Sequence, residues 1–311
     1  MPKGEEVPGN VRKIQELAVR YRLNPEMRNE IWVEGSFDAR MYRLFLNRHG
    51  RSDWTVFPIH TMNITKEVLE PLGMRVNDRN RVIHLSRTVC EKIGEGDLTA
   101  PIFIIDWDLE YLTDTDPIGC RLCLVTDVPS IEIYGIEPDS LQNLLTKYVN
   151  TDELTGQQIF DLIAPVLNEC FLIRAALHSD GDGISMFDDV HQCCRREDLQ
   201  LSLDIEEVIR LSIDRSRKPV KPTREEVRAK VEEKCAYLTP EKRQAIHKDD
   251  AATLLKMVVS ELEIPKNLQH MDNFIRPIPH SLEIGELAKY PMFQELLRRT
   301  ERSPGEPEPA A

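Results

Sequence analysis

The stretch EIWVEGSFDARMYRLFLNRHG, residues Glu30 to Gly50, decides the fold that we expect for this chain. Its apolar run Ile31 to Val33 is typical of a short buried strand, and glycine and serine follow at a turn. Apolar residues then recur at helical spacing up to Gly50, which occupies the place of a helix C-cap. Glu34 therefore lies on a strand-to-helix turn. In an α/β sheet, a side chain at the carboxyl end of a strand faces the crevice where ligands bind.

Strand and helix patterns alternate from this stretch to about Tyr148. Further strands are predicted at TVFPIH, APIFIID and CRLCLVTD, and helices at TKEVLEPLG, RNRVIHLSRTVCEKIG and EPDSLQNLLTKYV. Beyond about Thr151 helical patterns dominate: GQQIFDLIAPVLNECFLIRAAL, where we expect Pro165 to cause a kink, SLDIEEVIRLSI, and a helix beginning at the capping-box pair Thr223 and Glu226. This order predicts an α/β fold, in which a mostly parallel sheet carries helices on both faces and a mainly helical C-terminal region follows.

Four segments are expected along the chain. They are an N-terminal helical extension at 1–29, an α/β domain at 30–150, a mainly helical domain at 151–301 and a disordered tail at 302–311. The tail is rich in proline and has no apolar residues to anchor it.

The composition is that of an acidic globular protein. The 311 residues are 30% charged and 41% hydrophobic, and the formal net charge is -13. No stretch reaches the roughly 18 consecutive apolar residues of a membrane span, and the first ten residues lack the apolar core of a secretory signal. We therefore expect a cytoplasmic protein without a membrane partner. Because the net charge repels nucleic acid at long range, binding of nucleic acid would require basic patches, metal ions or a partner subunit.

Cysteine usage favours reduced thiols. The chain has seven cysteines, an odd number, which argues against a disulfide framework. Cys120 and Cys123 have the CxxC spacing of a zinc site, which is the alternative to weigh. However, this pair runs directly into an apolar strand and no second CxxC follows at finger-like spacing. We interpret both residues as core cysteines.

A second strand also ends in acidic residues. In APIFIIDWDLEYL an apolar run leads to Asp106, Trp107 and Asp108, and the two aspartates share a face if the strand continues through them. With Glu34, this places three carboxylates at two strand ends. Mg²⁺ prefers such hard oxygen ligands, and a divalent cation would keep neighbouring carboxylates ionised. Alternatively, Glu34 only complements a helix dipole, and Asp38 is either a first-turn helix residue or a ligand.

Together, VEGSFD and IIDWD resemble the Toprim domain of topoisomerases, primases and a set of nucleases. That domain has a strand ending in Glu-Gly, an aspartate three residues after the glycine, and a later apolar strand ending in Asp-x-Asp. The resemblance implies a Toprim-like catalytic domain at 30–150. A nuclease fits best, because the chain is too short for strand-passage domains and offers no zinc-binding domain of the kind that primases carry.

The stretch CLVTDVPSIEIYGIEPDSLQNLL narrows the resemblance to Toprim nucleases related to the OLD family, in particular the stand-alone effectors found beside ABC-type ATPases in bacterial phage defence. There a Thr-Asp element and a later glutamate follow the Asp-x-Asp strand, and the matching residues here are Thr126, Asp127 and Glu132. The segment IHKDDAATLLKMV is similar to a Gly-(His/Lys)-Asp element of these effectors, but Ile246 takes the glycine position. The role of His247 therefore stays open.

The resemblance implies an Mg²⁺-dependent or Mn²⁺-dependent nuclease that hydrolyses phosphodiester bonds in DNA or RNA, including tRNA. It implies a toxic anti-phage effector, partnered by an ABC-type ATPase or by further copies of itself. The alternative is a catalytically inactive Toprim-like interaction subunit of such a complex. The implied catalytic residues are Glu34, Asp106, Asp108 and Glu132. The implied metal ligands are Glu34, Asp106, Asp108 and Asp127, with one or two ions bound.

Two basic stretches are candidates for contact with nucleic-acid phosphates. The denser one, DRSRKPVKPTR, contributes Arg215, Arg217, Lys218 and Lys221, with a solvated linker as the alternative. The other, MRVNDRNRVIHLSR, contains Arg75, Arg79, Arg81 and Arg87. Asp180 and Asp182 suggest a calcium loop, but the terminal glutamate of that motif is missing, so we interpret them as part of a solvated turn.

Overall fold

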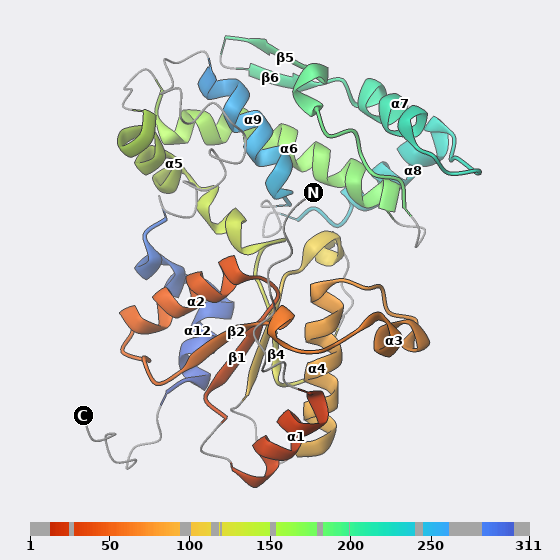
Figure 1. Ribbon diagram of the computed structural model, residues 1–311. Helices are drawn as coiled ribbons and strands as arrows, with labels where there is room; N and C mark the ends of the chain where they lie inside the picture. Colours follow the sequence, from red (N-terminus) through yellow and green to blue (C-terminus); the bar gives the residue numbers. More distant parts are fainter. Residues whose placement is uncertain are drawn as a thin grey trace, which may run out of the picture. The chain divides into compact units, whose positions relative to one another are not determined.

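The computed structural model describes residues 13–24, 28–93, 101–112, 118, 120–149, 154–178, 183–198, 200–239, 245–260 and 282–301 (Figure 1). The chain divides into two compact units. The first contains residues 1–106, 116–127 and 284–311, and the second contains residues 107–115 and 128–283. The predicted calcium-loop residues Asp180 and Asp182 and the predicted tail at 302–311 lie outside the described residues.

The first unit is built on a parallel sheet of four strands in the order β2-β1-β3-β4. The strands are β1 (Glu30–Val33), β2 (Thr55–Pro58), β3 (Ile102–Ile105) and β4 (Cys123–Val125). β1 is central and pairs with β2 and β3, so that Ile31 lies opposite both Val56 and Ile102. All four residues of β1 and of β3 are buried, as expected for strands covered on both faces.

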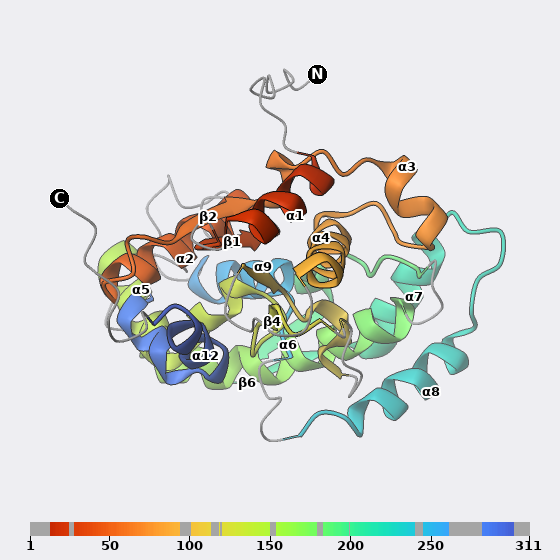
Figure 2. The same cartoon turned by 90° about the horizontal axis from the view of Figure 1, so that it is seen from below.

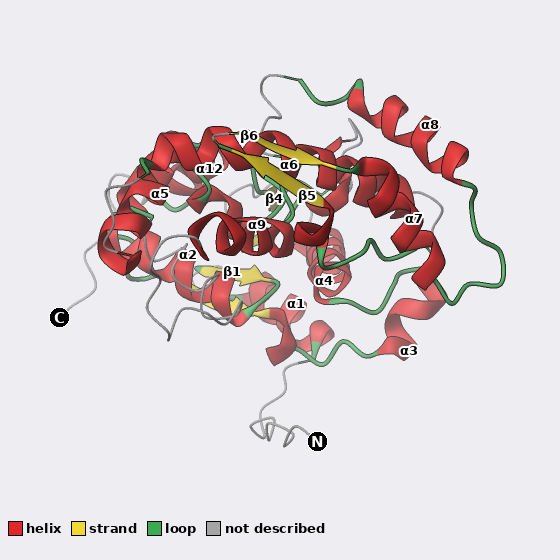
Figure 3. Cartoon of the chain, turned by 90° about the horizontal axis from the view of Figure 1, so that it is seen from above, coloured by secondary structure: helices red, strands yellow, loops and turns green. Residues whose placement is uncertain are grey.

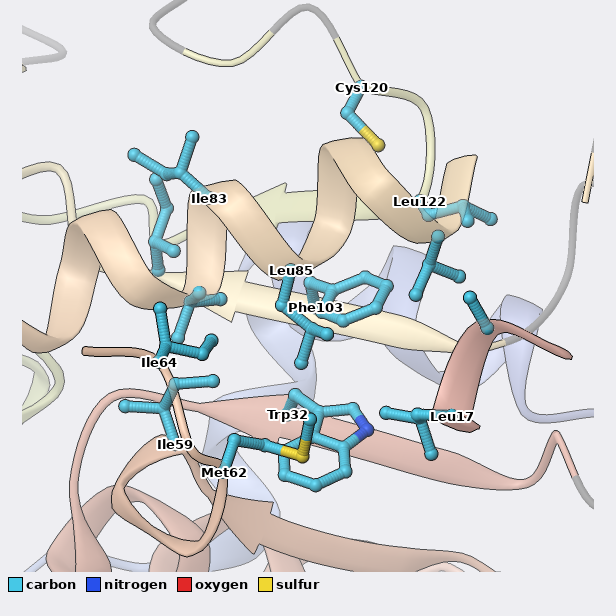
Figure 4. Close-up of a cluster of buried hydrophobic side chains, with 14 of the residues drawn as sticks. Leu17, Trp32, Ile59, Met62, Ile64, Ile83, Leu85, Phe103, Cys120 and Leu122 are labelled. Carbon is cyan, nitrogen blue, oxygen red and sulfur yellow. The ribbon is translucent and has the colours of Figure 1, made fainter. Parts of the chain in front are cut away.

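Helices cover both faces of this sheet, which confirms the predicted α/β fold (Figure 1). α1 (Ile14–Leu23) and α4 (Asp78–Ile93) lie side by side on one face (Figure 2). Their apolar side chains pack with Trp32 and Phe103 in one buried cluster (Figure 4). α2 (Ser36–Arg48) and α12 (Pro291–Arg299) lie on the other face, where Phe45 contacts Phe293 edge to face at 4.7 Å between ring centroids.

Short helical turns complete the first unit. They are η2 (Ile59–Thr61), α3 (Lys66–Leu69), η3 (Glu70–Leu72) and η10 (Ile284–Lys289). The helix predicted at TKEVLEPLG is therefore present as α3 and η3.

The second unit is mainly helical, as predicted for the C-terminal part of the chain. Its longest described helix, α6 (Gly156–His178), contains Pro165, which does not end the helix. The capping box of Thr223 and Glu226 is confirmed, because each residue's backbone N–H donates to the other's side chain. The other elements are η4 (Asp108–Leu112), η5 (Ile131–Gly135), α5 (Pro138–Leu144), η6 (Leu145–Val149), η7 (Val190–Cys193), α7 (Ile205–Arg215), α8 (Arg224–Cys235) and α9 (Lys248–Ser260).

An antiparallel hairpin of β5 (Cys194–Glu197) and β6 (Gln200–Leu203) was not predicted (Figure 3). The helical pattern SLDIEEVIRLSI was expected to begin at Ser202, but that residue lies in β6. The helix begins at Ile205 because the Asp204 side chain caps it and accepts a hydrogen bond from the Glu207 N–H at 3.0 Å.

The division into units also differs from the predicted boundaries at residues 30, 150 and 151. Residues 128–149 belong to the helical unit, whereas α12 belongs to the unit that contains the sheet. α1, predicted as a separate extension, packs into the core of the first unit. Among the described helices, none combines the length and the apolar character that crossing a membrane requires.

Candidate functional site

Acidic residues follow three adjacent strands of the sheet. Glu34 comes directly after β1, Asp106 directly after β3, and Asp127 two residues after the end of β4. Because these strands are parallel neighbours, their carboxyl ends lie at one edge of the sheet. All three residues belong to the first unit. We call these residues, together with Asp38, the edge carboxylates.

Glu34 and Asp106 are in direct contact. The Asp106 backbone N–H donates a hydrogen bond to Glu34 Oε1 at 3.0 Å. On the carbonyl side, Arg79 Nε donates to the Asp106 oxygen at 3.1 Å. These contacts fix the chain directly after β3 against the turn after β1. They bring together two residues that the sequence places far apart.

Asp38 acts as a capping residue of α2. Its Oδ2 accepts a hydrogen bond from the Gly35 N–H at 2.8 Å, which is the return bond of a capping box. A Cβ on Gly35 would lie 3.3 Å from the same oxygen, so glycine permits this close approach. The structure therefore gives Asp38 the structural role that its position in the first helical turn allowed.

Asp127 is held by the C-terminal helix of the first unit. Both of its carboxylate oxygens accept from the backbone N–H of Met292, at 3.1 and 3.2 Å. Met292 lies in the first turn of α12, where unpaired N–H groups and the helix dipole favour a negative charge. Sequence reasoning missed this contact because it assigned α12 to the helical domain.

The sequence analysis also did not select Tyr42, which lies in α2, as a candidate site residue. Its side chain is only 2% exposed, and its hydroxyl has no hydrogen-bond partner among the described atoms. Burial raises the pKa of this phenol well above its usual value, and the charges of Asp106, Asp38, Asp127 and Glu34 raise it further. The charges of all four edge carboxylates therefore act on one buried hydroxyl. The available signal was its position four residues after Asp38, which places both residues on one face of a helix.

The edge carboxylates have the right chemistry for a magnesium ion, because Mg²⁺ binds carboxylate oxygens together with waters and substrate phosphates and often takes only one or two carboxylates. In the part of the chain that the structure describes, however, no group of three or more His, Cys, Asp or Glu side chains is placed so that it could hold a metal ion. The buried hydroxyl of Tyr42, on which the charges of these carboxylates act, is a further hydrogen-bond donor. The residues at the edge fit a magnesium site of the type in which water and substrate supply most of the ligands.

Asp108 and Glu132 belong to the second unit. β3 ends at Ile105, and Asp108 has a positive φ of 53° at the start of η4, so Asp106 and Asp108 do not share a face of a strand as expected. The Asp108 N–H donates to the Pro129 oxygen at 2.9 Å. The chain therefore turns sharply after Asp106, and the aspartate pair does not act as a single strand end.

Glu132 pairs with a lysine that the sequence analysis did not select. Lys248 Nζ lies 3.2 Å from Glu132 Oε1, and the Glu132 side chain is 15% exposed. Lys248 begins α9 and follows directly after His247. Within the segment IHKDD, it is therefore the lysine that contacts a predicted catalytic residue.

His247 is surrounded by charged groups of the second unit. Burial lowers the pKa of its imidazole, and the Arg174 charge lowers it further, whereas Asp250, Asp249 and Asp108 oppose this change. Its Nδ1 is buried, makes no hydrogen bond to a described atom and lies 3.8 Å from Asp249 Oδ2. Asp108 is therefore close enough to influence His247, although the two residues are distant in sequence.

The predicted nucleic-acid contacts lie in the second unit, where Arg215, Arg217 and Lys218 line a surface pocket of about 510 Å³. The guanidinium of Arg215 lies 4.1 Å from the ring centroid of Phe187, which orients it. Lys221 is not part of the lining, and its Nζ donates to the Asp214 oxygen at 3.1 Å.

In the other basic stretch, MRVNDRNRVIHLSR, the arginine side chains bond to groups of the first unit. Arg79 binds the Asp106 carbonyl, Arg81 pairs with Asp78 at 2.6 Å, and Arg87 Nε donates to the Ile118 oxygen at 3.4 Å. Arg75 also has an interaction partner. These arginines stabilise the fold around α4, so the pocket at Arg215 is the better candidate for binding phosphate.

Cys120 lies in the hydrophobic core of the first unit, and Cys123 is partly buried and packs against that core, in line with the prediction of core cysteines. Both are free thiols, and burial raises the pKa of each.

Comparison with known proteins adds no relative: no protein-family model matches the chain, and no curated protein matches it. The resemblance of VEGSFD and IIDWD to the Toprim domain therefore rests on these residues alone.

Proposed function

We propose that this chain is a metal-dependent nuclease of the Toprim type, which hydrolyses phosphodiester bonds of DNA or RNA. The observation that carries the proposal is the set of edge carboxylates. Glu34, Asp106 and Asp127 follow three parallel strands at one sheet edge, and the first two are in contact through the Asp106 N–H and Glu34 Oε1 at 3.0 Å. Metal-ion catalysis of phosphoryl transfer needs such a group of hard ligands.

Each residue has a distinct role in the proposed site. Glu34 and Asp106 are the proposed metal ligands from the first unit, and the Asp106 hydrogen bond orients the Glu34 carboxylate. Asp127, fixed by the Met292 N–H, adds negative charge and a further ligand. When bound, Mg²⁺ or Mn²⁺ would supply an activated water and neutralise charge on the leaving oxygen.

The second unit contributes candidate groups of its own. For Asp108 and Glu132, the resemblance alone implies catalytic roles. Lys248 beside Glu132 provides a cation for contact with a phosphate oxygen. The pocket at Arg215, Arg217 and Lys218 would bind the nucleic-acid backbone, which the net charge of -13 otherwise repels.

Cleavage by the purified protein tests this proposal. Plasmid, single-stranded DNA and total tRNA are each incubated with the chain in Mg²⁺, Mn²⁺ or excess chelator. We expect cleavage only with metal, and we expect Glu34→Ala to abolish it while circular dichroism shows an intact fold. Asp53→Ala is the matched control, because Asp53 belongs to the same unit but precedes β2 at the opposite edge of the sheet.

Cleavage that persists in excess chelator would overturn the metal-dependent mechanism. Failure to cleave any of the three substrates with either metal would favour the other candidate, a catalytically inactive interaction subunit.

We further propose that the nuclease is a cytoplasmic defence effector, whose toxicity is restrained by an ABC-type ATPase or by self-association. An unregulated nuclease acting on host nucleic acid would be harmful to the cell. Expression of the chain alone should therefore be tolerated if self-association restrains it, and toxic if a separate partner is required. Size-exclusion chromatography of the purified chain separates the two cases, because only self-association gives an oligomer. A monomer that is fully active in cells and yet does not harm them would contradict both forms of restraint.

A further inference from the structure

Tyr42 carries an unsatisfied hydrogen-bonding group at the proposed metal site. Its hydroxyl is buried in the first unit without a partner among the described atoms, although buried hydroxyls are normally hydrogen-bonded. A buried hydroxyl without a hydrogen-bond partner calls for an explanation. One explanation is that its hydrogen bond forms only when a ligand is present.

The surroundings of Tyr42 are fixed by rigid elements. Asp38 precedes it by one helical turn on α2 and is held by the Gly35 N–H. On the other side its ring stacks on Phe293 with 5.6 Å between centroids. Phe293 directly follows Met292, whose N–H binds Asp127. The helix that positions Asp127 therefore also holds the ring of Tyr42.

The charged groups that act on this hydroxyl are carboxylates, which can accept a hydrogen bond. Glu34, Asp38, Asp106 and Asp127 are the acidic groups that act on Tyr42. A protonated phenol donates one hydrogen bond, and a carboxylate oxygen accepts it. Carboxylates that bind a metal are usually held by a hydrogen bond from a neighbouring group, which fixes their orientation.

We propose that Tyr42 is a positioning residue of the metal site, whose hydroxyl donates a hydrogen bond to an edge carboxylate when a divalent cation is bound. This inference rests on the proposed metal site but not on nuclease activity. Without the cation, mutual repulsion between the carboxylates works against their convergence, and the hydroxyl stays without a partner. With the cation, the carboxylates converge and one of them accepts the bond. Tyr42 therefore acts on the metal through a ligand.

A pair of tyrosine variants tests the inference. Tyr42→Phe removes only the hydroxyl and keeps the ring that stacks on Phe293. Tyr21→Phe is the matched control, because Tyr21 is also buried in the first unit but its hydroxyl is satisfied. Tyr21 donates to Glu30 and accepts from Trp32 Nε1 at 2.9 Å. The readouts are the melting temperature without metal and the Mn²⁺ dissociation constant from isothermal titration calorimetry.

The two variants should behave in opposite ways. We expect Tyr42→Phe to melt at or above the wild-type temperature without metal, because it buries no unsatisfied donor, and to bind Mn²⁺ about 10- to 100-fold more weakly. We expect Tyr21→Phe to melt lower and to bind Mn²⁺ as tightly as the wild type.

Unchanged Mn²⁺ affinity in Tyr42→Phe would overturn the role of Tyr42 while leaving the metal site intact. A wild-type protein that binds no Mn²⁺ would overturn the proposed metal site and this inference with it. Loss of affinity in Tyr42→Phe in a protein that cleaves no nucleic acid would support the inference and count against the nuclease.

Discussion

At the scale of single residues, Arg174 and Asp250 form a bidentate ion pair inside the second unit. Arg174 Nε and Nη2 lie 2.8 and 2.7 Å from the two Asp250 oxygens, and the Asp250 side chain is 1% exposed. We expect Arg174→Met to reduce the free energy of unfolding by about 3–5 kcal/mol, because it leaves a buried charge without its partner. Urea denaturation measures this change.

The double variant with Arg174→Met and Asp250→Leu is the control for this prediction. It removes both charges, so we expect it to recover most of the lost stability. A single variant as stable as the wild type would show that the pair does not matter for folding.

His247 makes stability depend on pH. Its folded pKa is lowered, mainly by burial, so the unfolded chain binds more protons than the folded chain near and below the ordinary histidine value of 6.5. Stability should therefore fall as the pH drops below about 6.5, by at most about 1.4 kcal/mol per pH unit for one proton. We expect His247→Gln to weaken this pH dependence in denaturation measured across that range. An unchanged dependence in the variant would show that His247 titrates normally in the folded chain.

Single residues also mark what sequence could and could not predict. Glu34 and Asp106 were identifiable because each follows an apolar run, and a strand end is a local pattern. The contact between Asp127 and the Met292 N–H joins residues that are 165 positions apart, and no local pattern encodes it. The ring contact between Tyr42 and Phe293 likewise joins two distant segments of the chain.

At the scale of elements, α5 and α6 meet at a glycine. A Cβ on Gly156 would lie 2.1 Å from the Pro138 oxygen and 2.4 Å from the Gln142 nitrogen, both backbone atoms. We expect Gly156→Ala to destabilise the chain by about 1–3 kcal/mol or more, because the two helices must move apart. Thermal or urea denaturation would measure the loss.

Gln157→Ala is the control for this prediction, because Gln157 is exposed in the same turn of α6. It should change stability by no more than about 0.5 kcal/mol. Equal stability of Gly156→Ala and the wild type would mean that α5 and α6 do not approach as closely as described.

Helices were predicted better than the hairpin of β5 and β6. α4 and α6 have long periodic patterns, whereas the hairpin strands have four residues each and alternate between half-buried and exposed positions. Their sequences, CRRE and QLSL, lack a continuous apolar run. The helix α7 begins directly after Asp204, because the Asp204 side chain caps its first turn.

At the scale of the whole molecule, the order of the chain differs from the order of its units. The chain leaves the first unit after Asp106, returns for residues 116–127 and returns again for residues 284–311. A sequence pattern predicts elements one after another, so it assigned residues 284–301 to the helical domain and residues 128–149 to the α/β domain. Which residues share a unit depends on contacts such as that between Arg299 Nη1 and the Arg121 oxygen at 2.8 Å.

The central claim is that Glu34, Asp106 and Asp127 bind a divalent cation, and the melting temperature in Mn²⁺ tests it most directly. A cation that binds only the folded chain stabilises it by RT ln(1 + [L]/Kd), about 2.7 kcal/mol at 100 times Kd. The wild-type melting temperature should therefore rise with Mn²⁺. Asp106→Asn removes one of the repelling charges, so it should melt higher than the wild type without metal and respond less to Mn²⁺. An Asp106→Asn protein that melts lower without metal and responds fully to Mn²⁺ would contradict the claim.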